Sequence, residues 1–197
     1  MRTRYDRLAR AVSAVYRRLD RRIASFRRAS GLACSRGCGE CCLSPEVEAG
    51  VLEMLPLALH LRRAGRVEQI LAWLGVGEPP RLCVFYSPDP LGSFGSRCSV
   101  YPLRPLLCRL FGFSAMTDPQ GRPQLVLCRR LREADPEGAR QAAAEAASGR
   151  SPVPLMSEWS LAMYRLDPGL GTRTLPINEA LRQALERAAL QRRWRER

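Results

Sequence analysis

The stretch CSRGCGECC, residues 34–42, places four cysteines within nine positions, and two of them are adjacent. Four more follow singly, so the eight thiols of the chain are Cys34, Cys38, Cys41, Cys42, Cys83, Cys98, Cys108 and Cys128. A C-x2-C pair lets two thiolates reach one ion from a tight turn, and zinc takes four such ligands tetrahedrally. An iron–sulfur cluster is also held by four cysteines. The spacing therefore favours metal ligation by these eight residues.

The adjacent pair Cys41–Cys42 leaves the number of sites open. Neighbouring side chains in extended backbone point to opposite sides, so we expect the pair to serve two metals, or one metal and a redox role. Eight thiols fit two four-ligand sites, or one polynuclear cluster with spare thiols. The alternatives are disulfides, a Cys38–Cys41 redox pair, and cysteines that only pack as small apolar groups. The redox pair is the weaker interpretation because no strand–helix unit surrounds it.

The sequence also indicates the cellular compartment in which these thiols function. The chain has 197 residues, and its hydrophobic fraction of 46% supports a packed core. Residues 1–30 have no uninterrupted apolar segment, and no part of the sequence approaches the roughly 20 apolar residues that cross a bilayer. We therefore expect a cytoplasmic protein without a membrane span. Thiols stay reduced in that compartment, which weakens the disulfide interpretation.

The formal net charge is +13, and all 32 basic residues are arginines. Ten of them lie in residues 1–30, where an apolar stripe of period three to four predicts one amphipathic helix over residues 3–29. Gly31 is expected to end it. The basic face is either plain solvated surface or a site for nucleic acid or an acidic protein.

Further helices are expected at about residues 45–64, with Pro56 inside, and at 66–75. Asp135-Pro136-Glu137 opens another helix, and a proline-bearing linker follows it. A last helix is expected to be capped by Asn178 and to face Leu181, Leu185 and Leu190 inward. Between them, glycines and prolines predict loops and short strands. The predicted fold is mainly α, with helices flanking an irregular, loop-rich, cysteine-ligated core that has at most short strands. We divide it into a basic helix (1–30), a metal-binding core (31–133) and a C-terminal helical extension that packs on the core (134–197).

The segments CSRGCGECC, CVFY, CSVYPLRPLLCRLFGF and LCRR together resemble the CxxCxxCC or YkgJ-like cysteine-cluster family. The resemblance covers about residues 34–130, and all eight cysteines fall where this family tends to have one. One departure is the three-residue gap between Cys34 and Cys38, where the family pattern has two residues. This alters the first turn without preventing ligation.

The resemblance implies a zinc- or iron-chelating domain, with zinc, iron or a 4Fe-4S cluster as cofactor. Arg104 and Arg109 lie beside cysteines and are expected to offset the negative charge of a thiolate-bound metal. No nucleophile with a base, phosphate loop or paired carboxylates stands out, so no catalytic residue is assigned. The alternatives are an iron–sulfur oxidoreductase or electron-transfer protein, and a nucleic-acid-binding protein that uses the basic N-terminal helix.

Overall fold

The computed structural model describes residues 3–34, 39–75, 81–87 and 97–193. The chain forms two compact units, which are interleaved along the sequence. Unit 1 comprises Met1–Ala14, Gly37–Pro105 and Met163–Arg197, and unit 2 comprises Val15–Arg36 and Leu106–Ala162. Each of the three consecutive segments expected from the sequence contributes to unit 1.

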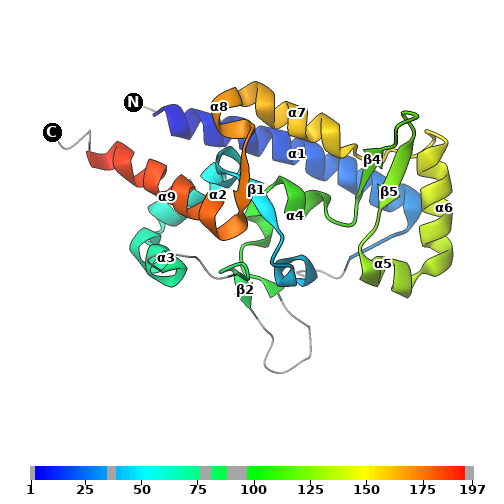
Figure 1. The fold of residues 1–197 in the computed structure, drawn as a ribbon, viewed down its shortest axis with the longest axis horizontal. Coiled ribbons are helices and arrows are strands. Elements are labelled where there is room, and N and C mark those ends of the chain that lie inside the picture. The colour runs from blue at the N-terminus through cyan, green and yellow to red at the C-terminus, as the bar shows by residue number, and fades with distance from the viewer. Residues whose placement is uncertain (1–2, 35–38, 76–80, 88–96, 194–197) are drawn as a thin grey trace. The chain divides into compact units, whose positions relative to one another are not determined.

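The expected N-terminal helix is confirmed as α1 (Arg4–Ser30), the long blue helix of Figure 1. Its apolar stripe is buried, with Val12, Leu19 and Phe26 fully enclosed. Gly31 ends the helix with a φ of 71°, and its N–H donates to the Arg27 carbonyl at 3.0 Å. A left-handed residue that returns a hydrogen bond to the last turn is the common way to end a helix, and glycine adopts it without strain.

Besides the first part of α1, unit 1 contains several helices and two small sheets. They are η1 (Glu40–Leu43), β1 (Glu48–Gly50), α2 (Val51–Arg63), α3 (Val67–Leu74), β2 (Tyr86–Ser87), β3 (Arg97–Cys98), η2 (Tyr101–Leu103), α8 (Pro168–Gly171), β6 (Thr174–Pro176) and α9 (Ile177–Arg193).

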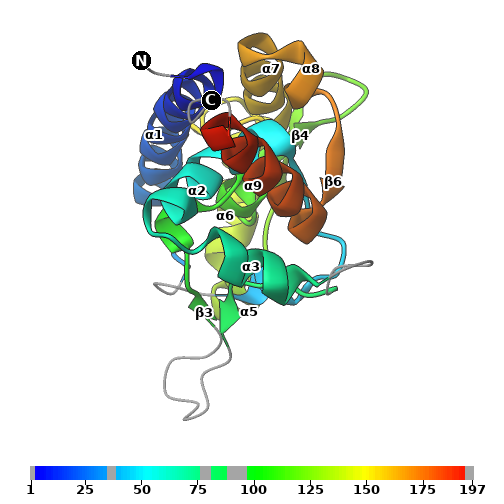
Figure 2. The ribbon, with the colours of Figure 1, turned by 90° about the vertical axis from the view of Figure 1, so that its left-hand side faces the viewer.

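The core of unit 1 lies between α2 and α9, which run side by side in Figure 1, and α9 also packs on α3 (Figure 2). Alanines at steps of four along α9, Ala180, Ala184 and Ala188, are fully buried and leave room for the partner helix to approach. The expected inward positions Leu181 and Leu185 are buried as well. The side chain of Leu190 lies outside the described residues.

The helix expected from residue 45 begins later, at Val51. Residues 48–50 instead form β1, which pairs antiparallel with β6 in the register Ala49↔Leu175. The turn signal Ser44-Pro45-Glu46 is local, but the strand partner lies more than a hundred residues away in sequence. A long-range hydrogen-bond ladder therefore overrides a good local helix start.

Unit 2 combines short helices with a β-hairpin. It contains α4 (Leu106–Leu110), β4 (Ser114–Thr117), β5 (Pro123–Val126), α5 (Arg129–Ala134) and α6 (Pro136–Ala147). The hairpin packs on α6 through β5, and the N–H of Ala115 in β4 donates to the Pro154 carbonyl at 2.9 Å. The helix α6 begins after Asp135 as expected, and Asp135 caps it by accepting from the Gly138 N–H at 2.9 Å.

The segment expected to be a linker before the last helix contains α7 (Met156–Leu166) and α8. The mainly α fold is otherwise confirmed: the sheets of the described residues are three short antiparallel pairs. Of the described helices, none combines the length and apolar character that a bilayer span requires.

Ion pairs join distant parts of unit 1. Arg62 on α2 donates to the Ala188 carbonyl of α9 at 3.0 Å and to the Asp6 carboxylate of α1 at 3.3 Å. Asp167, before α8, accepts from the Arg4 guanidinium and from the Leu170 N–H at 3.1 Å. Burial alone would raise the pKa of Asp167, but these hydrogen bonds and the Arg4 charge outweigh it, so the pKa is lowered.

Replacing Asp167 by alanine removes both the α8 cap and the partner of Arg4. We expect Asp167→Ala to lower the free energy of unfolding by about 1–2 kcal/mol at neutral pH. Because the folded-state pKa is lowered, the wild-type advantage is complete above the unfolded-state pKa of about 4 and is lost as the pH falls through the folded-state value. Urea unfolding across that pH range measures it. Glu137→Ala, at an exposed pair with Arg140, is the control and should cost little; equal costs for both variants would contradict the expectation.

Candidate metal centre

Cys41 and Cys42 lie on η1, a single 3-10 turn in which the Cys42 N–H donates to the Gly39 carbonyl at 2.8 Å. Both side chains are buried. The Cys42 thiol lies within hydrogen-bonding range of the Cys41 sulfur. The expectation that the adjacent thiols point apart is therefore wrong, because it assumed extended backbone where the chain makes a helical turn.

Cys83 and Cys98 are presented by two turns that the pairing of β2 with β3 holds together. Cys98 is the register partner of Tyr86. The Tyr86 N–H donates to the Cys83 carbonyl at 2.9 Å, and the Ser99 N–H donates to the Phe85 carbonyl at 3.0 Å. Both cysteines are buried. The pairing of β2 with β3 thus brings the two cysteine-bearing turns together.

Four sulfurs of unit 1 meet around Cys42. Its thiol is within hydrogen-bonding range of Cys41, Cys83 and Cys98, and these three contacts, together with burial, raise the pKa of Cys42. Three segments of the chain that are distant in sequence therefore converge on one buried sulfur.

The contact with Cys42 has the opposite effect on two of its neighbours. It lowers the pKa of Cys83, with help from a hydrogen bond that the Phe85 N–H donates to the sulfur and against the effect of burial. It also lowers the pKa of Cys98 to about 7, where burial opposes the shift and the Val100 N–H adds to it. Each of these turns thus points a backbone N–H at its own sulfur, an arrangement that favours thiolate.

Arg104 lies beside this group of thiols. Its Nε donates to the Tyr101 carbonyl at 3.1 Å, and its guanidinium stacks 3.5 Å from the Tyr101 ring centroid. Its positive charge contributes to the lowered pKa of Cys98. The Arg104 charge therefore favours the thiolate form of Cys98. A role for Arg104 beside a metal stays a prediction.

Arg109 is placed differently. Its side chain is 6% exposed, Nη1 lies 2.7 Å from both carboxylate oxygens of Asp20, and the guanidinium lies 4.3 Å from the Tyr16 ring centroid. Both of these contacts are made to α1 within unit 2. A role for Arg109 beside a metal stays a prediction.

Three further cysteines belong to unit 2. Cys34 is half-buried after α1, Cys108 is buried on α4, and Cys128 immediately precedes α5. Gly112, at a φ of 81°, lies so close to Cys128 that an added Cβ would come within 3.1 Å of the cysteine Cβ. Cys38 lies outside the described residues.

The prediction that Asn178 caps the last helix is wrong. Asn178 does not cap α9 but lies inside the first turn, 2% exposed. Its Nδ2 donates to the Leu82 carbonyl at 2.7 Å, and its Oδ1 accepts from the Val84 N–H at 3.1 Å. Asparagine at a helix start is typical of a cap, so no local signal indicates this long-range contact.

The donor set of unit 1 suits a thiolate-binding metal. Four cysteines match the ligand number of tetrahedral zinc and of an iron–sulfur cluster. No three His, Cys, Asp or Glu side chains in the described parts of the chain are arranged to hold an ion as they stand. The four sulfurs meet around Cys42 instead, so ligation requires them to lose protons and to turn toward a common centre.

A family model, CxxCxxCC, described as "Putative zinc- or iron-chelating domain", matches residues 33–133, just over half of the chain. No curated protein and no solved structure matches the chain. The matched region contains all eight cysteines and both arginines discussed above, and it ends well before Asn178.

The positive charge of Arg104 is expected to affect the titration of the Cys98 thiol. In metal-free protein we expect Cys98 to react with iodoacetamide with a midpoint near pH 7, and Arg104→Gln to move that midpoint upward because a favourable charge is removed. Mass spectrometry of the modified peptides over a pH series identifies the cysteine. Arg104→Lys, which keeps the charge, should shift it less, and Arg81→Gln, at an exposed position, should leave it unchanged. Equal midpoints in all four proteins would contradict this.

Proposed function

The chain belongs to the CxxCxxCC family of zinc- or iron-chelating domains, and on that premise we propose that it holds zinc or iron through Cys41, Cys42, Cys83 and Cys98 as one four-sulfur set. The observation that carries the proposal is the convergence of three cysteine segments on the Cys42 sulfur. Buried cysteines that only pack would have no reason to meet at one point, because a lone thiol is satisfied by apolar neighbours.

The surroundings of the four sulfurs support the proposal through charge. Four thiolates on a divalent ion carry about two negative charges by formal counting. The N–H groups of Phe85 and Val100 and the guanidinium of Arg104 all favour negative sulfur. A bound cation would replace the protons by which the thiols now satisfy one another, so metal uptake is expected to release protons and to weaken at low pH.

The remaining cysteines, Cys34, Cys38, Cys108 and Cys128, extend the proposal to a second set of ligands or to a larger cluster. An iron–sulfur cluster would supply one-electron redox chemistry, and the protein would then act in electron transfer or as an oxidoreductase. A reducing compartment such as the cytoplasm would keep the thiols available, and we propose that location.

Metal analysis of protein purified without oxygen tests the proposal. We expect about one or more zinc or iron ions per chain, and Cys42→Ser should remove at least one because it replaces the central sulfur. Cys128→Ser, in unit 2, is the comparison: unchanged metal content would favour a single site in unit 1, and a separate loss would favour two. A folded wild-type protein with far less than one ion per chain, or a Cys42→Ser variant with full content, would overturn the proposal.

The optical spectrum of the same sample separates the metals. A zinc protein is colourless, whereas an iron–sulfur cluster gives a brown protein whose visible absorbance bleaches on reduction. A colourless sample with zinc would remove the electron-transfer version and leave the chelating function intact.

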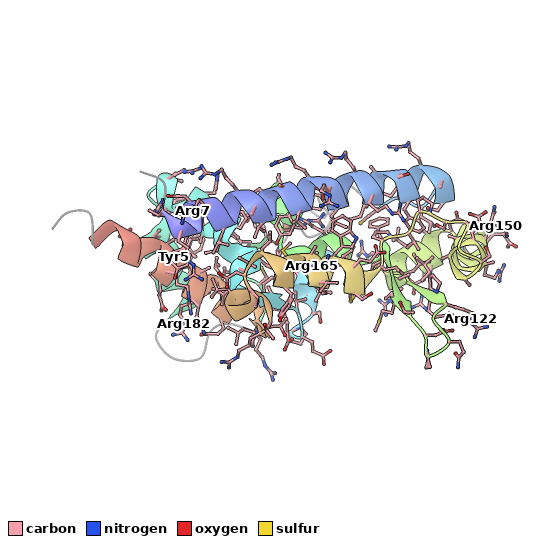
Figure 3. The ribbon with its side chains drawn as sticks, turned by 90° about the horizontal axis from the view of Figure 1, so that it is seen from above. Tyr5, Arg7, Arg122, Arg150, Arg165 and Arg182 are labelled. Atoms are coloured by element: carbon pink, nitrogen blue, oxygen red, sulfur yellow. The ribbon has the colours of Figure 1, made fainter. Side chains whose placement is uncertain are left out.

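A second candidate function rests on the exposed face of α1. Figure 3 shows nitrogen-tipped side chains projecting along one edge of this helix. Within the part of α1 that belongs to unit 2, all of the following arginines are exposed: Arg17, Arg18, Arg21, Arg22, Arg27 and Arg28. Positions 17, 21 and 28 differ by four and seven and so share a face. We propose that this face binds the phosphates of a nucleic acid.

Salt dependence tests the nucleic-acid proposal. Changing Arg17, Arg21 and Arg28 together to glutamine should weaken binding to duplex RNA or DNA and reduce the slope of log affinity against log salt by about one for each phosphate that an arginine no longer neutralises. Titration of a fluorescent duplex at several salt concentrations measures both. The control changes Arg129, Arg140 and Arg150, which alters net charge equally at other exposed sites of unit 2. Equal effects of the two triple variants would contradict a defined binding face.

A further inference from the structure

The segment Thr174–Asn178 lies more than forty residues beyond the end of the family region, yet it contacts two of the cysteine-bearing segments. Asn178 makes the more direct contact. Its amide donates to the carbonyl of Leu82 and accepts from the N–H of Val84, the two residues that flank Cys83. The Asn178 side chain is buried, so it replaces a missing backbone partner on either side of the cysteine.

The other contact is made to the chain that follows Cys41 and Cys42. The Ile177 N–H donates to the Val47 carbonyl at 2.9 Å, and β6 pairs with β1 immediately beyond. Val47 is five residues from Cys42, with only one turn between them. The chain after Cys42 and the Cys83 turn are thus both hydrogen-bonded to the segment Thr174–Asn178. The Cys98 turn is held to the Cys83 turn by the pairing of β2 with β3.

From this arrangement we infer that Asn178 is a positioning residue for Cys83, and that through it the C-terminal segment determines how well the thiol group retains a metal. The retention half of this inference rests on the proposed function. The positioning half concerns the thiol alone and holds for the metal-free protein.

The physical reason is the shape of the Cys83 turn. The Phe85 N–H must point at the Cys83 sulfur, and the sulfur must reach Cys42. Both requirements depend on the orientation of the peptide units at Leu82 and Val84, which the Asn178 amide fixes from the two sides. Without the amide, these two backbone groups would have to find other partners, and the sulfur would move with them.

The experiment compares Asn178→Ala with Leu185→Ala. Leu185 is fully buried in α9 and its apolar side chain forms no hydrogen bond to a cysteine turn, so its truncation destabilises the same helix without touching Leu82 or Val84. Two quantities are measured at a temperature where both variants remain folded: the rate at which a chromophoric chelator removes the bound metal, and the rate at which iodoacetamide modifies Cys83 in metal-free protein.

We expect Asn178→Ala to accelerate metal removal about tenfold and to change the modification rate of Cys83 relative to that of Cys128. Leu185→Ala should lower the melting temperature at least as much while leaving both rates within about twofold of wild type. If both variants changed the rates in proportion to their melting temperatures, Asn178 would be merely structural and the inference would fall.

The two halves remain separable. If the wild-type protein binds no metal, the proposed function and the inference about metal retention are both overturned. The modification rate of Cys83 relative to that of Cys128 would still decide whether Asn178 positions the Cys83 thiol. A wild-type protein that binds metal, with Asn178→Ala unchanged in both rates, would overturn the inference and leave the proposed function standing.

Discussion

The contact of the Cys42 thiol with three other sulfurs is the interaction on which the centre of unit 1 depends. Several thiolates cannot be buried together without a cation, because the interior screens their repulsion poorly. The contacts of the Cys42 thiol accordingly act in opposite directions, raising the pKa of Cys42 and lowering those of Cys83 and Cys98. A divalent cation is the natural replacement for such shared protons.

Three kinds of structure bring the sulfurs together, and each acts over a different range. A single 3-10 turn makes the adjacent thiols neighbours in space. A two-residue antiparallel pair aligns the turns of Cys83 and Cys98. The segment Thr174–Asn178, which ends in the first turn of α9, is hydrogen-bonded to the chain after Cys42 and to the residues on either side of Cys83. None of these elements is large, and of them β1 and β6 are shown to pack on the core, β1 on α2 and α9 and β6 on α9.

The features that could be predicted from the sequence are those set by local physics. The stripe of α1, its glycine stop and the Asp135 cap are decided within a few residues, and the cysteine spacing names the chemistry of the donors. The start of α2 and the role of Asn178 could not be predicted, because a strand partner and a turn far away in sequence decide them. The adjacent thiols were misjudged because their outcome depends on backbone conformation and not on spacing.

The pairing of β1 with β6 also has a consequence for biosynthesis. Cys41, Cys42, Cys83 and Cys98 all precede residue 99, whereas β6 and Asn178, which contact the segments of Cys42 and Cys83, come more than seventy residues later. During translation, these four thiols are thus synthesised well before the segment Thr174–Asn178 that contacts two of their turns. A metal site that includes Cys42 and Cys83 would thus be completed only late in synthesis, and its thiols would stay open to oxidation until then.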